Sequence, residues 1–197
     1  MQKNNNPDKR IIIAGSGGQG ILLLGRLISY IAMLSGMNVT WFPSYGAEMR
    51  GGTANCSVVV SKNRIGSPLV TTTDILVVMN CPSLKRFLPR VIQGGTVIYD
   101  SSMISDEKCG TDHFSRLSLY NTVGIKASEE AIRMGSIKFA NMFLLGAFLA
   151  TTFNSIDQQL LKLSFEKTLS KRHHRSIPKN IEAVLEGFRL AQKSADF

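Results

Sequence analysis

The sequence predicts an α/β fold with a doubly wound, largely parallel sheet and a helical C-terminal part. Three observations predict it: short apolar β-branched segments alternate with helical ones, a glycine cluster joins the first strand to the first helix, and residues 128–197 have mostly helical spacing. The 197 residues, 44% of them hydrophobic, suffice for one good-sized core and are too few for two. We therefore expect a disordered, asparagine-rich leader over 1–8 and a single domain over 9–197.

The first unit is a strand over 10–14, a glycine loop over 15–20, and a helix from 21 that ends near Gly36. Gly15, Gly17 and Gly20 fit the G-x-G-x-x-G spacing, which is typical of a tight turn, close approach of an anion, and close helix–strand packing. The free N–H groups and the dipole at the helix start favour a phosphate or carboxylate there. This makes the fold Rossmann-like. The alternative is that the glycines only form a tight turn.

The second strand, over 38–42, does not support a nicotinamide-dependent dehydrogenase. Such a site places an acidic residue at the end of this strand to bind the ribose. The strand here continues into Pro43 and Ser44, and the first acid, Glu48, lies within the next loop.

The loop over 43–52 has mixed chemistry, with hydroxyls on Ser44 and Tyr45, a carboxylate on Glu48, and a guanidinium on Arg50 that suits carboxylates or phosphates. Its flexible positions are Gly46, Gly51 and Gly52. Because ligands bind outside the carboxyl ends of the strands in such sheets, we expect this loop to lie beside the glycine loop. The alternative is that Glu48 and Arg50 merely pair with each other.

Further strands and helices alternate along the middle of the chain. We expect strands over 54–61, 74–79, 96–100 and within 117–126, a turn over 63–68 followed by a return strand, and a helix over 82–92. Polar residues follow two strand ends, at 80–82 and 100–102. They line the same edge of the sheet or cap helices, and capping is the favoured interpretation.

The C-terminal part is helical from 128, with breaks near Gly135 and Pro178. Its segment over 139–153 is apolar on nearly every side, which predicts a helix buried in the core of the domain; the alternative is a face covered by another subunit. At about 15 residues it falls short of the roughly 20 that span a bilayer. We expect no membrane segment and no secretion.

The three cysteines, Cys56, Cys81 and Cys109, are scattered and form no C-x-x-C pair. They support neither an iron–sulfur cluster nor a structural zinc, and they favour a reducing cytoplasm over a disulfide framework. His113, His173 and His174 lack metal-ligand spacing, so no metal is assigned.

The net charge of +9 raises the question of nucleic acid, with the densest basic run at 171–175. This run has no interleaved aromatic residues and no helix-turn-helix spacing, so a solvated loop between two helices is the favoured interpretation. Docking of an acidic partner and binding of phosphates remain open for it.

Several motifs together carry a resemblance to a known family. Residues 15–20 read G-S-G-G-Q-G, residues 43–52 read P-S-Y-G-A-E-M-R-G-G, and T-A-N-C-S-V follows from Thr53; weaker matches lie at 65–68, 73–76 and 140–147 and in the final helix. Over nearly all of 9–192 the chain resembles the γ subunit of the 2-oxoacid:ferredoxin oxidoreductases. The form of the second motif is more similar to separate γ subunits of 2-oxoglutarate and 2-oxoisovalerate enzymes than to pyruvate enzymes.

The resemblance implies a complex that oxidatively decarboxylates a 2-oxoacid, with 2-oxoglutarate favoured, forms an acyl-CoA and CO₂, and passes electrons to ferredoxin. It implies partner α and β subunits and a ferredoxin-like δ subunit, which hold thiamine diphosphate, magnesium and iron–sulfur clusters. This chain shows no thiamine diphosphate motif of its own. Coenzyme A is expected at a site shared with the partners, and this chain alone is expected to be inactive.

The candidate ligand-binding or subunit-interface residues are those of the two loops. They are Gly15, Ser16, Gly17, Gly18, Gln19, Gly20, Ser44, Tyr45, Gly46, Glu48, Arg50, Gly51 and Gly52, with Glu48 and Arg50 as candidate contributors to catalysis. A free-standing nucleotide-binding oxidoreductase of Rossmann type is the alternative function, and a basic nucleic-acid-binding module is a third.

Overall fold

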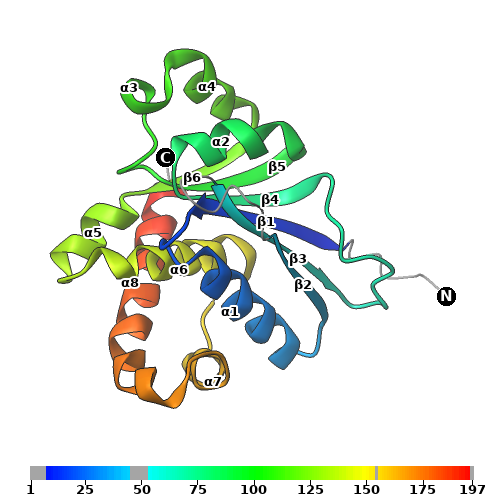
Figure 1. The fold of residues 1–197 in the computed structure, drawn as a ribbon, viewed down its shortest axis with the longest axis vertical. Coiled ribbons are helices and arrows are strands. Elements are labelled where there is room, and N and C mark those ends of the chain that lie inside the picture. Colours follow the sequence, from blue (N-terminus) through cyan, green and yellow to red (C-terminus); the bar gives the residue numbers. More distant parts are fainter. Residues whose placement is uncertain (1–7, 45–52, 154, 196–197) are drawn as a thin grey trace.

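The computed structural model describes residues 8–44, 53–153 and 155–195, so the predicted leader lies almost wholly outside the described residues. Within these ranges six strands form one sheet in the order β2-β3-β1-β4-β5-β6 (Figure 1). The strands are β1 (Lys9–Ser16), β2 (Asn38–Ser44), β3 (Thr53–Ser61), β4 (Thr73–Val78), β5 (Val91–Asp100) and β6 (Asn121–Ile125). Strands β1, β4, β5 and β6 run parallel, whereas β3 is antiparallel to both of its neighbours. The predicted α/β class with a largely parallel sheet is confirmed.

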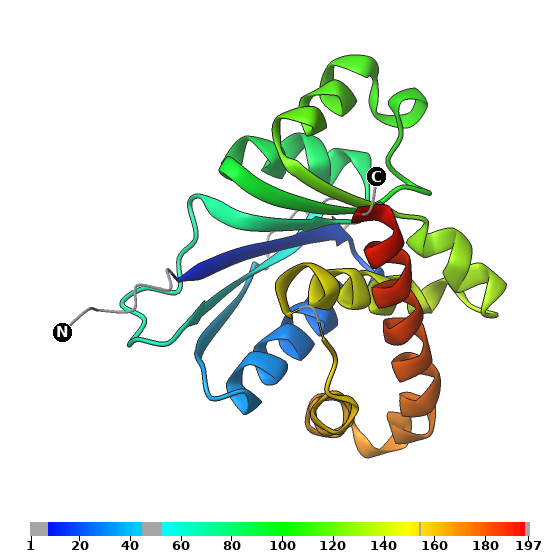
Figure 2. The ribbon, with the colours of Figure 1, turned by 180° about the vertical axis from the view of Figure 1, so that it is seen from behind.

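Helices cover both faces of the sheet (Figures 1 and 2). One face carries α1 (Ile21–Leu34), α5 (Ala127–Arg133), α6 (Ala140–Phe153), α7 (Gln158–Thr168) and α8 (Ile177–Ala195), and the other carries α2 (Cys81–Phe87), α3 (Asp106–Cys109) and α4 (Thr111–Ser115). Alternate residues of β1 pack on opposite faces of the sheet. Ile11 and Ile13 belong to the larger hydrophobic cluster on one face, and Ile12 and Ala14 belong to the smaller cluster on the other. Buried strands of this kind read as continuous apolar runs, which is why they were visible in the sequence.

Helix α6 lies in the core of the described fold, as predicted, with every residue from 140 to 150 buried. Its main partner is α8, and two glycines let the helices touch. A Cβ at Gly146 would overlap the Val184 carbonyl, and one at Gly187 would overlap the backbone of Phe143. The apolar character of α6 therefore reflects burial on all sides within this chain.

Two predictions for the middle of the chain are wrong. The helix expected over 82–92 ends at Phe87 and is followed by the short 3-10 helix η2 (Leu88–Arg90), since Pro89 cannot donate a helical hydrogen bond, and Val91 already pairs with Thr73 of β4. The expected return strand after 63–68 does not exist in the described segment 62–72, because β3 already has a neighbour on each side. The strand expected within 117–126 is confirmed as β6, which follows the 3-10 helix η3 (Arg116–Leu119).

The expected break near Pro178 lies just before that residue. Helix α8 begins at Ile177, and Pro178 stands in its first turn, where a missing N–H costs nothing. The break itself is the 3-10 helix η5 (Lys171–Ser176), so the basic run does connect two helices.

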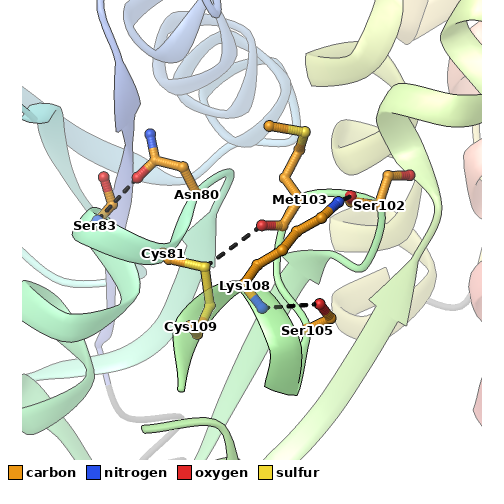
Figure 3. Close-up of a disulfide and its surroundings, with 8 residues drawn as sticks. All are labelled: Asn80, Cys81, Ser83, Ser102, Met103, Ser105, Lys108 and Cys109. Atoms are coloured by element: carbon orange, nitrogen blue, oxygen red, sulfur yellow. Dashed lines mark hydrogen bonds between the residues drawn. A yellow bond between two sulfur atoms is a disulfide. The ribbon is translucent and has the colours of Figure 1, made fainter.

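Cys81 and Cys109 form a disulfide, which corrects the prediction that no disulfide is present (Figure 3). The two residues are 28 positions apart in sequence, yet β4 and β5 are neighbours, and the segments that follow them meet beyond the sheet. Their Cα atoms lie 5.2 Å apart, within the range that a disulfide spans. Two of the three thiols on which the expectation of a reducing compartment rested are thus paired.

None of the helices that the structure describes combines the length and the hydropathy that crossing a bilayer requires.

Candidate functional site

The glycine loop joins the end of β1 to the start of α1, as its sequence predicts. The loop is closed by two hydrogen bonds: the Gln19 N–H donates to the Ser16 carbonyl over 3.2 Å, and the Ser16 N–H donates to Oε1 of Gln19 over 2.6 Å. Gly18 and Gly20 have φ values of 89° and 74°, in the region that favours glycine. The loop is therefore a defined turn with an internal side-chain bridge.

Gly15, Gly18 and Gly20 are each needed for a different reason. A Cβ at Gly15 would lie 2.6 Å from Cδ1 of Ile21 and 2.7 Å from Oε1 of Gln19, so the strand end could not approach the helix. A Cβ at Gly18 would meet open space, and only the backbone angle demands glycine there. A Cβ at Gly20 would overlap the side-chain amide of Asn141. Packing and backbone conformation within the chain thus account for these three glycines.

Asn80 fixes the loop from the side of β4. It is 8% exposed, and its Nδ2 donates to Oγ of Ser16 over 2.8 Å and to Oε1 of Gln19 over 3.3 Å. Its Oδ1 accepts from the Ser83 N–H over 2.9 Å, which caps α2. The expectation that polar residues here cap a helix is confirmed, and the same amide also holds the glycine loop.

Asn141 of α6 fixes the other end of the loop. It is 3% exposed, and its Nδ2 donates to the Gly20 carbonyl over 3.2 Å, whereas its Oδ1 has no hydrogen-bond partner among the described residues. Sequence reasoning missed both this residue and the contact of Asn80 with the loop. The available signal for Asn141 was a single amide within an otherwise apolar helix.

Neither its own N-cap residue nor its own first turn offsets the positive potential at the N-terminus of α1. Gly20 is its N-cap and offers no side-chain hydrogen bond, and the first turn contains no acidic residue. The first N–H groups of a helix have no partner within it, and the helix dipole adds to their field. Together with the adjoining loop, this end of α1 is chemically suited to bind a phosphate or a carboxylate.

The first turn of α1 is held against β3 at Cys56. The buried Cys56 thiol donates to the Ile21 carbonyl over 3.6 Å, and Gly25 allows the helix to come so close that a Cβ would lie 2.5 Å from the Cys56 sulfur. Burial raises the pKa of this thiol from 9.0 to about 12. Cys56 therefore remains a neutral thiol that packs β3 against the first turn of α1.

The second predicted loop lies mostly outside the described residues, which include Ser44 but not 45–52; Tyr45, Gly46, Glu48, Arg50, Gly51 and Gly52 therefore remain predictions. Both flanks of this segment are described. Thr53 pairs with Ser16, and Ser44 pairs with Asn55, so the segment starts and ends at the edge that carries the glycine loop. Nη1 of Arg86 also donates to Oγ1 of Thr53 over 3.0 Å.

Asp100 and Ser102, at the end of β5, act as helix caps. Asp100 is fully buried and accepts from the backbone N–H and the hydroxyl of Ser128, while Oγ of Ser102 accepts from the Glu129 N–H over 3.1 Å. These bonds hold the first turn of α5. Of the two interpretations offered for this segment, capping is the one that the geometry supports.

The basic run forms η5 on the opposite side of the molecule from α2 to α4, between α7 and α8 (Figure 1). Nε of Arg172 donates to Nε2 of His173, and Nε2 of His174 lies 3.1 Å from the Leu169 carbonyl. In the described part of the chain, no group of three or more His, Cys, Asp or Glu side chains is arranged to hold a metal ion.

The fold and this geometry define a class: a Rossmann-like α/β domain whose first glycine loop and helix start form a candidate anion site. Residues 10–190 match the family described as pyruvate ferredoxin/flavodoxin oxidoreductase. The chain belongs to that family, as a γ-type member.

Two relatives of this chain belong to enzymes with different names. The chain is 34% identical over 190 residues to the ketoisovalerate oxidoreductase subunit VorA of Methanothermobacter thermautotrophicus, a match covering 96% of this chain and 38% of the relative. It is 30% identical over 184 residues to the 2-oxoglutarate synthase subunit KorC of Archaeoglobus fulgidus, covering 93% and 88%. The chain thus spans under two fifths of VorA but most of KorC.

Among solved structures, the chain is similar to the 2-oxoglutarate:ferredoxin oxidoreductase of Magnetococcus marinus with 2-oxoglutarate, coenzyme A and succinyl-CoA bound. The TM-score is 0.76 at 27% identity, and the match covers 94% of this chain and 31% of the larger one.

Proposed function

We propose that this chain is the γ subunit of a cytoplasmic 2-oxoacid:ferredoxin oxidoreductase complex and that it positions coenzyme A. In the proposed reaction a 2-oxoacid, coenzyme A and two oxidised ferredoxins give an acyl-CoA, CO₂, two reduced ferredoxins and a proton. The observation that carries the proposal is the rigid glycine loop beside an uncapped helix N-terminus, in a chain of this family.

The chemistry of coenzyme A suits this arrangement. Its pyrophosphate and its ribose phosphate are anions that hydrogen-bond well to backbone N–H groups at a helix start. The loop is fixed by Asn80 and Asn141 before any ligand arrives, which reduces the entropy lost on binding. Coenzyme A supplies the thiol that accepts the acyl group, and this chain's part is to bind and orient the phosphates.

The second loop is proposed to complete the site. Its flanks, Ser44 and Thr53, lie at the edge of the sheet that carries the glycine loop. Arg50 would add a guanidinium for a phosphate or carboxylate, and Glu48 would orient it or a neighbouring subunit. Replacing Arg50 or Glu48 by Ala should lower turnover of the assembled complex far more than it lowers the stability of this chain. Normal turnover in both variants would remove this loop from the site.

The remaining cofactors are assigned to partner subunits. Cys56 is buried, and Cys81 and Cys109 are bonded to each other, so this chain offers no set of cysteine ligands for an iron–sulfur cluster. We propose α and β subunits, and a ferredoxin-like δ subunit, as the holders of thiamine diphosphate, magnesium and the clusters. Ferredoxin would be the external electron acceptor.

The favoured substrate is 2-oxoglutarate. The supporting observation is that the chain matches KorC over most of the length of that subunit, whereas it matches only part of VorA. 2-Oxoisovalerate is the competing substrate, since the identity to VorA is slightly higher.

The test is to purify the tagged full chain anaerobically from its own host. We would assay the eluate for dye reduction that depends on coenzyme A and on 2-oxoglutarate, 2-oxoisovalerate or pyruvate. Stoichiometric larger partners and activity with 2-oxoglutarate are expected. Activity with another acid instead would show that 2-oxoglutarate is not the substrate. A chain without partners or activity would overturn the proposed function and favour a free-standing nucleotide-binding protein.

A matched pair of variants asks whether the glycine loop takes part. Gly17→Val places a bulky side chain in the exposed loop, and Gly66→Val places one in an exposed turn far from it, where a Cβ meets open space. Gly17→Val is expected to lose most coenzyme A-dependent activity, whereas Gly66→Val keeps it. If both variants assemble and turn over normally, the loop is only a turn.

A further inference from the structure

The disulfide joins the start of one helix to the end of another. Cys81 is the first residue of α2, and Cys109 is the last residue of α3 (Figure 3). The bond therefore ties the segment that follows β5 to the helix that follows β4.

Cys81 is directly bonded to the residue that holds the glycine loop. Its predecessor Asn80 caps α2 through Ser83 and donates to Ser16 and Gln19. Any change in the backbone at Cys81 is thus transmitted to Asn80 within one peptide unit. The disulfide is therefore linked to the glycine loop through the peptide bond between Asn80 and Cys81 and through the two hydrogen bonds that Asn80 donates to Ser16 and Gln19.

The reduced state also has a place in this structure. The Cys81 sulfur lies 3.5 Å from the Met103 carbonyl oxygen, so that a thiol formed there has an acceptor for its proton (Figure 3). Cys109 is 1% exposed and shares the smaller hydrophobic cluster with Ile104 and Leu117, which keep the segment packed without the bond. Opening the disulfide should therefore loosen this region without unfolding the chain.

We propose that Cys81–Cys109 is a thiol–disulfide switch that sets the order of the glycine loop through Asn80. In the oxidised state α2 and α3 are tied and Asn80 holds Ser16 and Gln19. In the reduced state α2 and α3 are no longer tied, the Cys81 thiol keeps the Met103 carbonyl as its acceptor, and the hold on the loop weakens. The consequence for coenzyme A rests on the proposed function. Disulfides in cytoplasmic proteins are mostly catalytic or redox-sensing, which agrees with such a role.

The chemistry is thiol–disulfide exchange with a thiol reductant. A thiolate attacks the sulfur of Cys81, which is the more accessible of the two, and forms a mixed disulfide while Cys109 leaves as a thiolate. A second reductant thiolate then attacks the reductant sulfur of that mixed disulfide and releases Cys81. Two reductant thiols become one disulfide, and the protein gains two electrons and two protons. Oxidation by a disulfide of the same class reverses the steps.

The third cysteine does not interfere with the measurement. Cys56 is buried beneath α1, and burial raises its pKa to about 12, so it stays an unreactive thiol. Alkylation of the native chain after reduction therefore reports on Cys81, the more accessible member of the pair.

The test is ¹H–¹⁵N NMR of the full chain with and without dithiothreitol, with thiol state verified by alkylation and mass. We expect the amide signals of residues 15–20 to shift on reduction, and amide exchange over 103–117 to accelerate about tenfold. Gly36 and Gly66, remote from the bond, serve as internal references and should not move. Loop signals that are identical in both states, or a bond that reduces only when the whole chain unfolds, would overturn the proposal.

Two variants separate the switch from general instability. Cys81→Ala should give the reduced spectrum with or without dithiothreitol. Asn80→Asp keeps an oxygen that caps α2 but loses the amide donor to Gln19, so reduction should then leave the loop signals nearly unchanged while exchange over 103–117 still accelerates. If reduction shifts the loop signals of Asn80→Asp as strongly as those of the unsubstituted chain, the path through Asn80 is wrong.

Titration with coenzyme A distinguishes this proposal from the proposed function. Tighter binding to the oxidised chain, by about tenfold, supports both, because a loop that is already ordered pays less entropy on binding. If coenzyme A binds neither state and the loop still responds to reduction, the switch stands and the proposed ligand falls. Equal affinity of both states would overturn control of the site by the switch.

Discussion

The two ends of the parallel strands use polar residues in opposite ways. We call the side of the sheet where β1, β4 and β5 begin the amino edge, and the side where they end, beside the glycine loop, the carboxyl edge. At the amino edge, Arg10 and Asp74 pair with each other, with Nε of Arg10 2.9 Å from the carboxylate and the Arg10 N–H donating to it over 2.8 Å. At the carboxyl edge, the neutral side chains of Ser16, Gln19 and Asn80 bond to one another. The charges of Arg10 and Asp74 neutralise each other at the first edge, whereas at the second no acidic residue in the first turn of α1 offsets the positive end of that helix.

This difference, and not the presence of a cavity, decides where a ligand is expected. A cavity of about 550 Å³ lies at the amino edge, between the starts of β1, β4 and β5 and the end of α6. Its hydroxyls at Thr151 and Thr152 donate to carbonyls of their own helix, and its carboxylate belongs to the Arg10 pair. At the carboxyl edge, the start of α1 has backbone donors that its N-cap residue Gly20 does not cap, which is the chemistry of an anion site.

The largest expected effect concerns Gly20. Replacing it by Ala forces a side chain into a positive φ and against the Asn141 amide, so we expect a loss of about 2–3 kcal/mol in the free energy of unfolding. Gly18→Ala is the matched control, since Gly18 shares the positive φ but faces open space; it should lose about 1 kcal/mol. Urea unfolding of both variants measures the difference. Equal losses would mean that the contact with Asn141 places no constraint on the loop.

The second effect separates capping from loop positioning. Asn80→Ala removes the α2 cap and the bonds to the glycine loop, and we expect about 1–2 kcal/mol of destabilisation together with weaker binding of coenzyme A. Asp157→Ala removes a comparable cap, to the N–H groups of Gln159 and Leu160, and should cost about 1 kcal/mol without affecting coenzyme A. Calorimetric titration and urea unfolding check the pair. A similar loss of affinity in both variants would show that Asn80 acts through stability alone.

The glycine loop shows how far the sequence carries the fold. The apolar run before Gly15 and the helical spacing after Gly20 suffice to predict β1 and α1 and the edge at which the loop lies. The orientation of β3 could not be predicted, because an antiparallel insertion between β2 and β1 depends on pairing across the sheet, and local sequence patterns do not encode it.

The long-range contacts around the glycine loop were less predictable from the sequence than the loop motif itself. Asn141 is 121 positions away from Gly20, and Cys109 is 28 positions away from its partner Cys81, so both contacts arise only when the sheet brings the segments together. A single sequence shows a lone amide and scattered thiols at these positions. Periodicity predicts which face of an element is buried, but not which polar group meets another across the core.

The third prediction tests the amino edge. Burial raises the pKa of Asp74, but the hydrogen bonds from Arg10 outweigh it, and the net pKa lies below its ordinary value of 3.8. A lowered pKa stabilises the fold above about pH 4 and loses that contribution as pH falls through the folded-state pKa. Because Arg10 is partly exposed and the pair is screened by solvent, we expect under about 1 kcal/mol.

Asp74→Asn should therefore weaken the pH dependence of unfolding below about pH 4 and leave the affinity for coenzyme A at pH 7 unchanged. Urea unfolding between pH 3 and pH 7 gives the first result, and titration of the ligand gives the second. An effect on affinity would mean that the two edges are coupled, against the division of roles argued above.

The smallest expected effect lies between the edges, at Cys56. Its pKa is raised from 9.0 to about 12 because the thiol is buried, so the folded state resists deprotonation. A raised pKa leaves stability fully present below pH 9, and the contribution is lost as pH rises from 9 toward 12, because the unfolded chain then releases the proton first. At pH 7 we therefore expect no pH-dependent contribution. In the native, reduced chain at pH 8, iodoacetamide should label Cys81 much faster than Cys56, as followed by mass spectrometry. Fast labelling of Cys56 would show that α1 opens from β3 in the native state, and the helix start would then be a mobile support for the anion site.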